Sequence, residues 1–126
     1  MPVAVRPHAL AAAVAALGLA VLLALGMADA SAAKRTCDIS GKEQKLGATY
    51  VTSLKVARVT CAKGQRVVKA FHRCRRVHGR AGHCRHRVKG FKCSEHRFNK
   101  IATQYDSNVT CKNGKARVWH TYTMFT

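Results

Sequence analysis

All six cysteines of this 126-residue chain lie after one long apolar run. The run extends from Ala9 to Met27 without a charged residue, follows Arg6, and ends in the small-residue stretch 28–33. A basic start, an apolar middle and a small-residue cleavage site are typical of a secretory signal peptide. We therefore expect residues 1–33 to be a signal peptide, cleaved between 30 and 33, and the protein to be secreted, either extracellular or in the cell envelope.

An uncleaved membrane anchor is the alternative interpretation of the same run. Its 19 residues approach the minimum length of a spanning helix. The run is rich in alanine, however, and candidate cleavage sites follow it directly. We therefore expect no transmembrane anchor after processing. The remainder, residues 34–126, is predicted to be a single basic, disulfide-rich domain and a monomer.

The cysteine count predicts disulfides, because short exported domains have small cores and are commonly stabilised by covalent bridges. Each bridge contributes about 2–4 kcal/mol by restricting the unfolded chain. Zinc competes for the same residues, but the cysteine spacings of 24, 13, 10, 9 and 18 positions contain no C-x2-C pair. The segment His83-Cys84-Arg85-His86 is dense in potential ligands and lacks a second cluster at ligand spacing. We expect no metal and no cofactor.

Hydrophobic periodicity predicts a strand and then a helix in the first half of the domain. The β-branched run 50–59 predicts a half-buried strand, with Tyr50, Leu54 and Val56 on one face and Ser53 and Lys55 on the other. Thr60 is a suitable N-cap for a helix that begins at Cys61 and ends by 78–79. The polar segment 34–47 is predicted to be an arm.

The second half predicts further strands. Residues 88–93 predict a short strand, and 94–107 an irregular segment or a helical turn. The pair Asn113-Gly114 is preferred in a two-residue type I′ turn, which would place Val109 opposite Val118. One face of this hairpin would then carry Val109, Cys111, Ala116, Val118, His120, Tyr122 and Met124. The fold class that follows is α+β, with one helix packed on a small, largely antiparallel sheet and stapled by disulfides.

The placement of these elements favours one disulfide scheme. Cys74 and Cys84 flank the end of the helix, and a strand that returns toward the start of the helix would bring Cys93 near Cys61. The favoured pairs are Cys74–Cys84, Cys61–Cys93 and Cys37–Cys111, although the spacing alone selects none of the possible connectivities.

Basic charge is concentrated between Lys63 and Lys100, where 13 Lys or Arg and five His accompany a single acid, Glu95. Loss of residues 1–33 removes one basic and one acidic group, so the net charge stays at +18. Such a field attracts polyanions, and binding by counterion release is steeply salt-dependent. Nucleic acid, an anionic cell-wall polymer, an anionic lipid surface and acidic polysaccharide are the candidate partners; a merely solubilising surface is the alternative. The expected contacts are Lys63, Arg66, Arg73, Arg75, Arg76, Arg80, Arg85, Arg87 and Lys89.

Trp119 and two histidines are further candidates. Trp119 falls on the polar face of the hairpin, where it could stack on bases or sugars, unless a loop or the arm 34–47 covers it. His72 on the helix and His120 on the last strand could form a ribonuclease-like acid–base pair. His120 falls on the inward face, which favours a hydrogen-bonded core histidine. The wide spacing of the acids disfavours a carboxylate-pair hydrolase, and the sequence contains no G-x-S-x-G, H-E-x-x-H or phosphate-loop motif. We therefore expect no enzyme and no catalytic residues.

Several short motifs carry a resemblance. They are Val59-Thr60-Cys61-Ala62, Val67-Val68, Gly90-Phe91-Lys92-Cys93 and Val109-Thr110-Cys111-Lys112-Asn113-Gly114 with a closing strand at Val118. From Cys37 to Tyr122 the chain resembles small, exported, cysteine-containing proteins of high-GC actinobacteria that have no assigned function. The resemblance implies an exported α+β domain and no activity or cofactor. The loop around Cys84 is richer in Arg and His than that family would suggest.

Three functional hypotheses follow. The first is a non-enzymatic module that contacts extracellular polyanions. The second is a cell-envelope structural, protein-interaction or inhibitor domain whose charge is incidental. The third is a small secreted ribonuclease or a cationic antibacterial protein.

Overall fold

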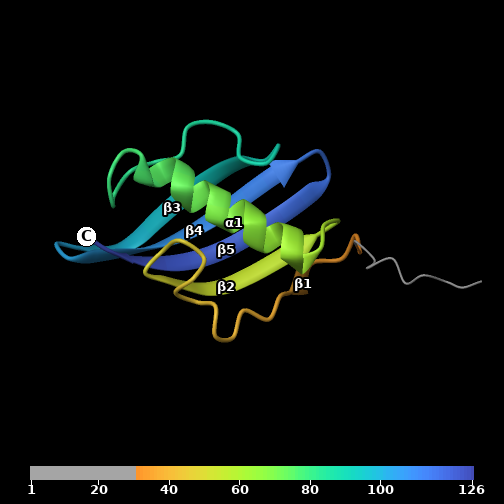
Figure 1. Ribbon diagram of the computed structural model, residues 1–126, viewed down its shortest axis with the longest axis horizontal. Coiled ribbons are helices and arrows are strands. Elements are labelled where there is room, and N and C mark those ends of the chain that lie inside the picture. Colours follow the sequence, from red (N-terminus) through yellow and green to blue (C-terminus); the bar gives the residue numbers. More distant parts are fainter. Residues whose placement is uncertain (1–30) are drawn as a thin grey trace, which may run out of the picture.

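The computed structural model describes residues 31–126 (Figure 1). The predicted signal peptide therefore lies almost entirely outside the described residues. Within residues 31–126, no helix combines the length and the hydrophobicity that crossing a membrane requires. The elements are β1 (Arg35–Thr36), β2 (Tyr50–Ala57), α1 (Cys61–Arg76), β3 (Lys92–Ile101), β4 (Gln104–Asn113) and β5 (Ala116–Phe125).

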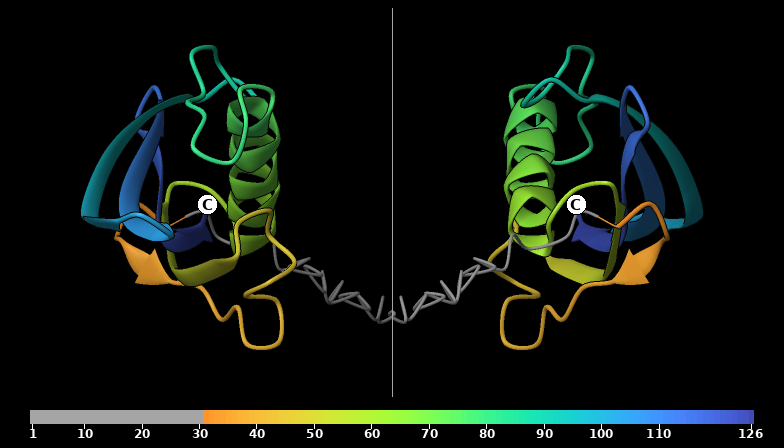
Figure 2. Two further views of the ribbon diagram at one scale, coloured as in Figure 1. Left: turned by 90° about the vertical axis from the view of Figure 1, so that its left-hand side faces the viewer. Right: turned by 90° about the vertical axis from the view of Figure 1, so that its right-hand side faces the viewer.

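The five strands form one antiparallel sheet in the order β1-β2-β5-β4-β3. α1 lies across one face of this sheet, together with the loop that follows it (Figure 2). Among residues 31–126, no helix or strand covers the opposite face (Figure 2). The predicted α+β class, with one helix on an antiparallel sheet and three disulfides, is confirmed.

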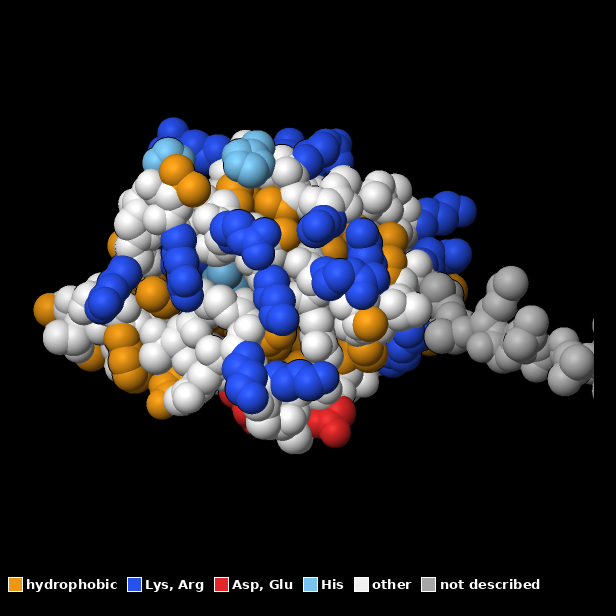
Figure 3. All heavy atoms as spheres, in the orientation of Figure 1, with side chains coloured by type: hydrophobic (Ala, Val, Ile, Leu, Met, Phe, Trp, Pro, Cys, Tyr) orange, Lys and Arg blue, Asp and Glu red, His pale blue; other side chains and the backbone are white. Residues whose placement is uncertain are grey.

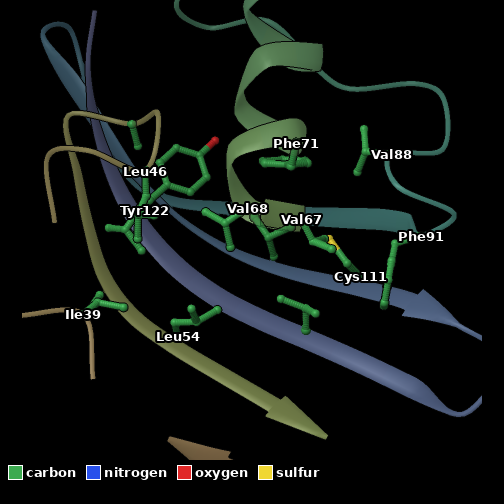
Figure 4. Packing of buried hydrophobic residues seen from close by; sticks show 14 of the residues in the cluster. Ile39, Leu46, Leu54, Val67, Val68, Phe71, Val88, Phe91, Cys111 and Tyr122 are labelled. Atoms are coloured by element: carbon green, nitrogen blue, oxygen red, sulfur yellow. The ribbon is translucent and has the colours of Figure 1, made fainter. Parts of the chain in front are cut away.

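The sequence of α1 explains both its start and its orientation. Thr60 caps the helix, since its hydroxyl oxygen accepts a hydrogen bond from the Lys63 backbone N–H at 3.1 Å. Val67, Val68 and Phe71 recur at helical spacing and are fully buried against the sheet (Figure 4). The helix ends at Arg76, two residues before the predicted limit.

Gly64 sets how closely α1 approaches β2. A Cβ atom at this position would lie 2.6 Å from Cγ1 of Val56, which is itself fully buried. The absence of a side chain therefore allows the first turns of the helix to rest directly on the strand. This contact places the N-terminal end of α1 over the β1–β2 edge of the sheet.

The prediction that Tyr50, the first residue of β2, shares the face of Leu54 and Val56 is wrong. An irregularity in the β2–β5 register lies between Val51 and Ser53, so the alternation of faces shifts at this point. Val51 is fully buried, whereas Tyr50 is 38% exposed and packs edge-on against Phe125 with ring centroids 5.9 Å apart. Leu54 and Val56 face the core as predicted.

The prediction for residues 94–107 is also wrong, because they form most of β3 and the start of β4. The inward-facing positions of β3 after Cys93 are Glu95 and Arg97, which are charged. Their side chains form an ion pair, with Nε of Arg97 2.7 Å from Oε1 of Glu95. Polar residues on the inner face conceal the alternation that normally identifies a strand.

The final hairpin has the predicted faces and a different turn. Asn113 pairs with Ala116, so Gly114 and Lys115 are the two central residues. Gly114 has a φ of 55° and Lys115 is not among the residues with positive φ, which fits a type II′ rather than a type I′ turn. The pairing therefore moves by two residues, and Val118 lies opposite Cys111. A shift by two keeps every side chain on its predicted face.

One of the three expected disulfides is confirmed and two are corrected. Cys74–Cys84 joins the last turn of α1 to the following loop. The other bridges are Cys37–Cys61 and Cys93–Cys111, in place of Cys61–Cys93 and Cys37–Cys111.

The strand order explains the corrected pairs. β3 lies at the edge of the sheet opposite β1, so Cys93 is far from the start of α1 and directly faces Cys111 on β4. β1 pairs with β2, beneath the start of the helix, and this places Cys37 beside Cys61.

We expect Gly64→Ala to destabilise the protein by about 1–3 kcal/mol, as overpacking does in cores that cannot relax. Alanine favours an isolated helix over glycine by about 1 kcal/mol, so the steric conflict with Val56 opposes the intrinsic preference. Urea unfolding of the variant measures the difference.

Val56→Ala provides the matched background for this test. In that background Gly64→Ala should become neutral or stabilising, because the conflicting methyl group is gone. A Gly64→Ala variant more stable than the parent chain would contradict the proposed close approach.

Candidate functional site

Four cations form a stripe along the solvent side of α1. They follow helical spacing, all four are exposed, and they point away from the buried face: Arg66, Lys69, Arg73 and Arg76. The stripe extends from Arg66 to Arg76, or about 15 Å along the helix. Figure 3 shows Lys and Arg side chains spread over this face of the molecule, with acidic side chains only at its lower edge.

The stripe borders an open cavity between α1 and the arm. Lys45, Gly47, Lys69, Arg73 and Arg76 line this cavity, whose volume is about 330 Å³. Nη2 of Arg76 donates a 2.6 Å hydrogen bond to the Gly47 carbonyl oxygen, which ties the arm to the helix. Four cations thus surround one concavity, and none of its lining residues is acidic.

A second open cavity, of about 550 Å³, lies next to the first. Arg76 borders both cavities, and Arg80, Thr49 and Phe125 are among the other residues that line the second. The exposed Arg80 side chain therefore extends the basic surface past the end of α1. We call the region formed by the stripe, Lys45 and Arg80 the helix face.

The predicted loop cations belong to a different part of the surface. Arg85, Arg87 and Lys89 are exposed in the loop between α1 and β3. Arg87 lines a cavity of about 360 Å³ with Lys92 and Lys112, beside the β4–β5 turn. The nine predicted contacts therefore do not form a single patch, and half-buried Lys63 at the start of α1 is separate from the loop.

Arg75 is the one predicted contact that the structure contradicts, because its side chain is fully buried. Its Nε donates to Nδ1 of His72 at 2.7 Å, and its Nη1 donates to the Arg80 carbonyl oxygen at 2.7 Å. The guanidinium also lies over the Tyr122 ring, 5.0 Å from its centroid. Arg75 follows Val68 and His72 at helical spacing, and this pattern places it on the inner face.

His72 and His120 lie together beneath the helix, with their Nε2 atoms 3.1 Å apart. Since Nδ1 of His72 accepts from Arg75, the proton of neutral His72 is on Nε2 and is donated to His120. The two histidines are 0% and 2% exposed. A substrate has no access to them, so the ribonuclease hypothesis loses the acid–base pair on which it rested.

Burial is the main cause that lowers the pKa values of both histidines. The pKa of His72 lies far below its ordinary value because of burial, with the nearby His120 and Arg75 as further causes. Burial, followed by the charge of Arg75, lowers the pKa of His120 from 6.5 to about 3. Both imidazoles are therefore neutral in the folded protein at physiological pH.

Glu95 is the centre of a second buried polar cluster. It accepts hydrogen bonds from Arg97, from the Tyr122 hydroxyl and from the Ser107 hydroxyl. Burial opposes its charge, but the hydrogen bonds from Arg97 and Tyr122 outweigh that effect and hold the pKa of Glu95 below its ordinary value. Arg97 also donates to the carbonyl oxygens of Ala81 and Gly82 at 2.7 and 2.6 Å. This cluster holds the loop against the sheet.

A potential metal ligand set is occupied by a disulfide. Ligand atoms of Cys74, Cys84 and His86 lie within 4.8 Å of one another. Both sulfurs are committed to the Cys74–Cys84 bridge, so they do not provide the thiolates that zinc requires.

Trp119 lies on the face of the sheet opposite α1. It is half-buried, and the middle of the arm does not cover it, because Ile39 and Leu46 pack into the core instead. The first residue of the arm does lie on the ring: the ammonium group of Lys34 is 4.3 Å from the ring centroid, so the arm covers Trp119 in part.

Two residues of the helix face were missing from the sequence prediction. Lys69 lies at i−4 from Arg73 and i+3 from Arg66, so the helical spacing would have placed it in the stripe. No local pattern indicates Lys45, because its position beside α1 depends on the tertiary path of the arm.

We expect the free energy of unfolding to decrease as the pH is lowered from 7.5 to 5. The unfolded histidines gain a proton near pH 6.5, whereas the buried His72 and His120 stay neutral. The unfolded state then binds more protons, and the slope approaches about 1.4 kcal/mol per pH unit for each such histidine only below about pH 6. Chemical denaturation at several pH values measures this slope.

His72→Gln should reduce the slope, and His78→Gln is the matched control because His78 is exposed in the turn that follows α1. The control should leave the slope unchanged. A parent protein equally stable at pH 7.5 and pH 5 would contradict neutral burial of the two histidines.

Comparisons with known protein families, with curated proteins and with solved structures give no match for this chain. The resemblance to exported actinobacterial proteins therefore stays a prediction.

Proposed function

We propose that this protein is a secreted, non-enzymatic module that binds an extracellular anionic polymer through the helix face. One observation carries the proposal: Lys45, Lys69, Arg73 and Arg76 surround a single concavity. The cations come from two segments that the fold brings together, the arm and the solvent side of α1. A concave site focuses their field on one ligand segment more effectively than scattered charges do.

The neighbouring charges support this proposal. The net charge of the chain is +18. Salt bridges among residues 31–126 involve Glu95 with Arg97 and His83, so they do not neutralise the helix face. An anionic polymer that lies along the helix face would release counterions from several phosphate, sulfate or carboxylate groups. Secretion is part of the proposal, and the three disulfides are compatible with an extracellular setting.

Heparin serves as the probe polymer. We expect binding measured by titration calorimetry to weaken strongly between about 50 and 200 mM NaCl. The Lys and Arg side chains displace sodium ions from the polymer when they bind, and added salt opposes this release. The double variant Lys69→Gln/Arg73→Gln should bind about ten-fold more weakly and show a shallower salt dependence. Arg76 is left unchanged because it also holds the arm at Gly47.

Arg85→Gln/Arg87→Gln is the matched control, since it removes the same charge from exposed residues of the loop. This control should change heparin affinity less than the helix variant does. Equal losses in the two variants would show that net charge alone governs binding, and affinity independent of salt would exclude the electrostatic mechanism.

A further inference from the structure

The uncovered face of the sheet has a regular arrangement of side chains. One row across the strands contains Lys55, Trp119, Thr110 and Ser94, which are paired neighbours on β2, β5, β4 and β3. A parallel row contains His96, Asn108 and Thr121. These residues point away from α1, because the residues between them along each strand face the core.

Aromatic rings occupy two positions on this face. Trp119 lies on β5, and on β3 His96 and Phe98 stack with ring centroids 6.4 Å apart and an interplanar angle of 14°. Neighbouring strands are about 4.8 Å apart, and His96 lies two residues along β3 from the row of Trp119, so the two positions are separated by roughly 10 Å across the sheet and roughly 7 Å along it. Two flat platforms at this separation fit separate planar groups of one extended ligand.

The same face is basic. Exposed Lys92 and Lys112 are paired neighbours at one end of it, and exposed Lys55 lies beside Trp119. The ammonium group of Lys34 lies over the Trp119 ring. The carboxylate of Asp106, at the far end, accepts hydrogen bonds from Thr123 and Asn99. A ligand for this face therefore carries negative charge beside its planar groups.

A small cavity next to Trp119 adds hydrogen-bonding groups. Its volume is about 210 Å³, and Ser53, Asn108, Thr110 and Thr121 are among the residues that line it with Trp119. Thr121 donates to the Asn108 side-chain oxygen at 2.9 Å, which leaves the Asn108 amide NH2 as a donor. The cavity is smaller than sites for drug-sized molecules, so it accepts one ring of a larger ligand.

We propose that the uncovered sheet face binds single-stranded nucleic acid, with one base stacked on Trp119 and a second on the His96–Phe98 pair. Aromatic rings among lysines are the features by which proteins hold unpaired bases and the phosphates between them. A stacked base displaces the Lys34 ammonium from the Trp119 ring, and this ammonium then faces the adjacent phosphate. Duplexes are excluded because their base faces are hidden by stacking. The inference goes beyond the helix face and does not depend on it.

Trp119 provides the measurement, because it is the only tryptophan of the chain. Titration of the full protein with a ten-nucleotide oligothymidylate should quench Trp119 fluorescence through stacking. Oligouridylate of the same length distinguishes DNA from RNA as the preferred strand, and quenching by either one supports the proposal. Heparin and inorganic polyphosphate carry charge without bases, so they should bind at the helix face without this quenching.

Two sets of variants test the residues involved. Trp119→Ala should weaken oligonucleotide binding by about five- to 100-fold, the range expected for loss of one base stack. Trp119→Phe keeps a ring and should retain most of the affinity. His96→Ser/Phe98→Ser should weaken binding independently of Trp119, which keeps the test valid if Trp119→Ala unfolds. Fluorescence anisotropy of a labelled strand reports binding in these variants.

Lys69→Gln/Arg73→Gln separates this inference from the proposed function. That variant should lose heparin affinity and keep the quenching by oligonucleotide. Heparin affinity therefore tests the proposed function, and Trp119 quenching tests this inference. Equal affinity for oligonucleotide and polyphosphate without quenching would overturn the inference. Stronger quenching by a polyuronate than by either oligonucleotide would also overturn it, and would assign the face to an acidic polysaccharide.

Discussion

The arrangement of helix, loop and sheet depends on the contacts made by the buried guanidinium of Arg75. It bonds to His72 within α1, to the Arg80 carbonyl in the loop and to the Met124 sulfur on β5. Its position over the Tyr122 ring adds a contact with the sheet. Removal of water from a full charge is costly, and these contacts offset that cost without a carboxylate bonded directly to the guanidinium. Any shift of α1 would break several of them together.

The helix end is held from two sides by buried charge. Arg75 holds the loop at the Arg80 carbonyl, and Arg97 holds it at the carbonyls of Ala81 and Gly82. Glu95 fixes Arg97 and accepts from Tyr122, whose ring lies beneath Arg75. The two clusters therefore meet at Tyr122. In a domain with a small apolar core, this network determines where the solvent side of α1 and its cations lie.

The sequence predicted those features that depend on local chemistry. The Thr60 cap, the buried stripe of α1 and the faces of the β4–β5 hairpin follow from capping and periodicity, and all are present. The Cys74–Cys84 bridge closes a short segment and was also predictable. For the candidate site, the concentration of basic charge pointed to Arg66, Arg73 and Arg76, and the structure places all three on the solvent side of the helix. Helical spacing, applied to every cation, would have added Lys69 and excluded Arg75.

Other features depend on tertiary structure that local patterns do not contain. β3 escaped recognition because Glu95 and Arg97 fill inward positions, and only their partners on other strands make this burial favourable. The Cys93–Cys111 bridge required the strand order, which places β3 at an edge. Lys45 joins the helix face only because of the path of the arm.

The cationic residues of this protein fall into two groups that differ in how far substitution affects the stability of the fold. The side chains of Arg75 and Arg97 are fixed by several hydrogen bonds each, whereas the side chains of Lys69 and Arg73 make no hydrogen bond or ion pair within residues 31–126. Surface substitutions of the second kind commonly alter stability by no more than about 0.5 kcal/mol. The scaffold can therefore accumulate changes in its outer charge pattern almost neutrally, so ligand preference could diverge among descendants of this chain while the architecture persists.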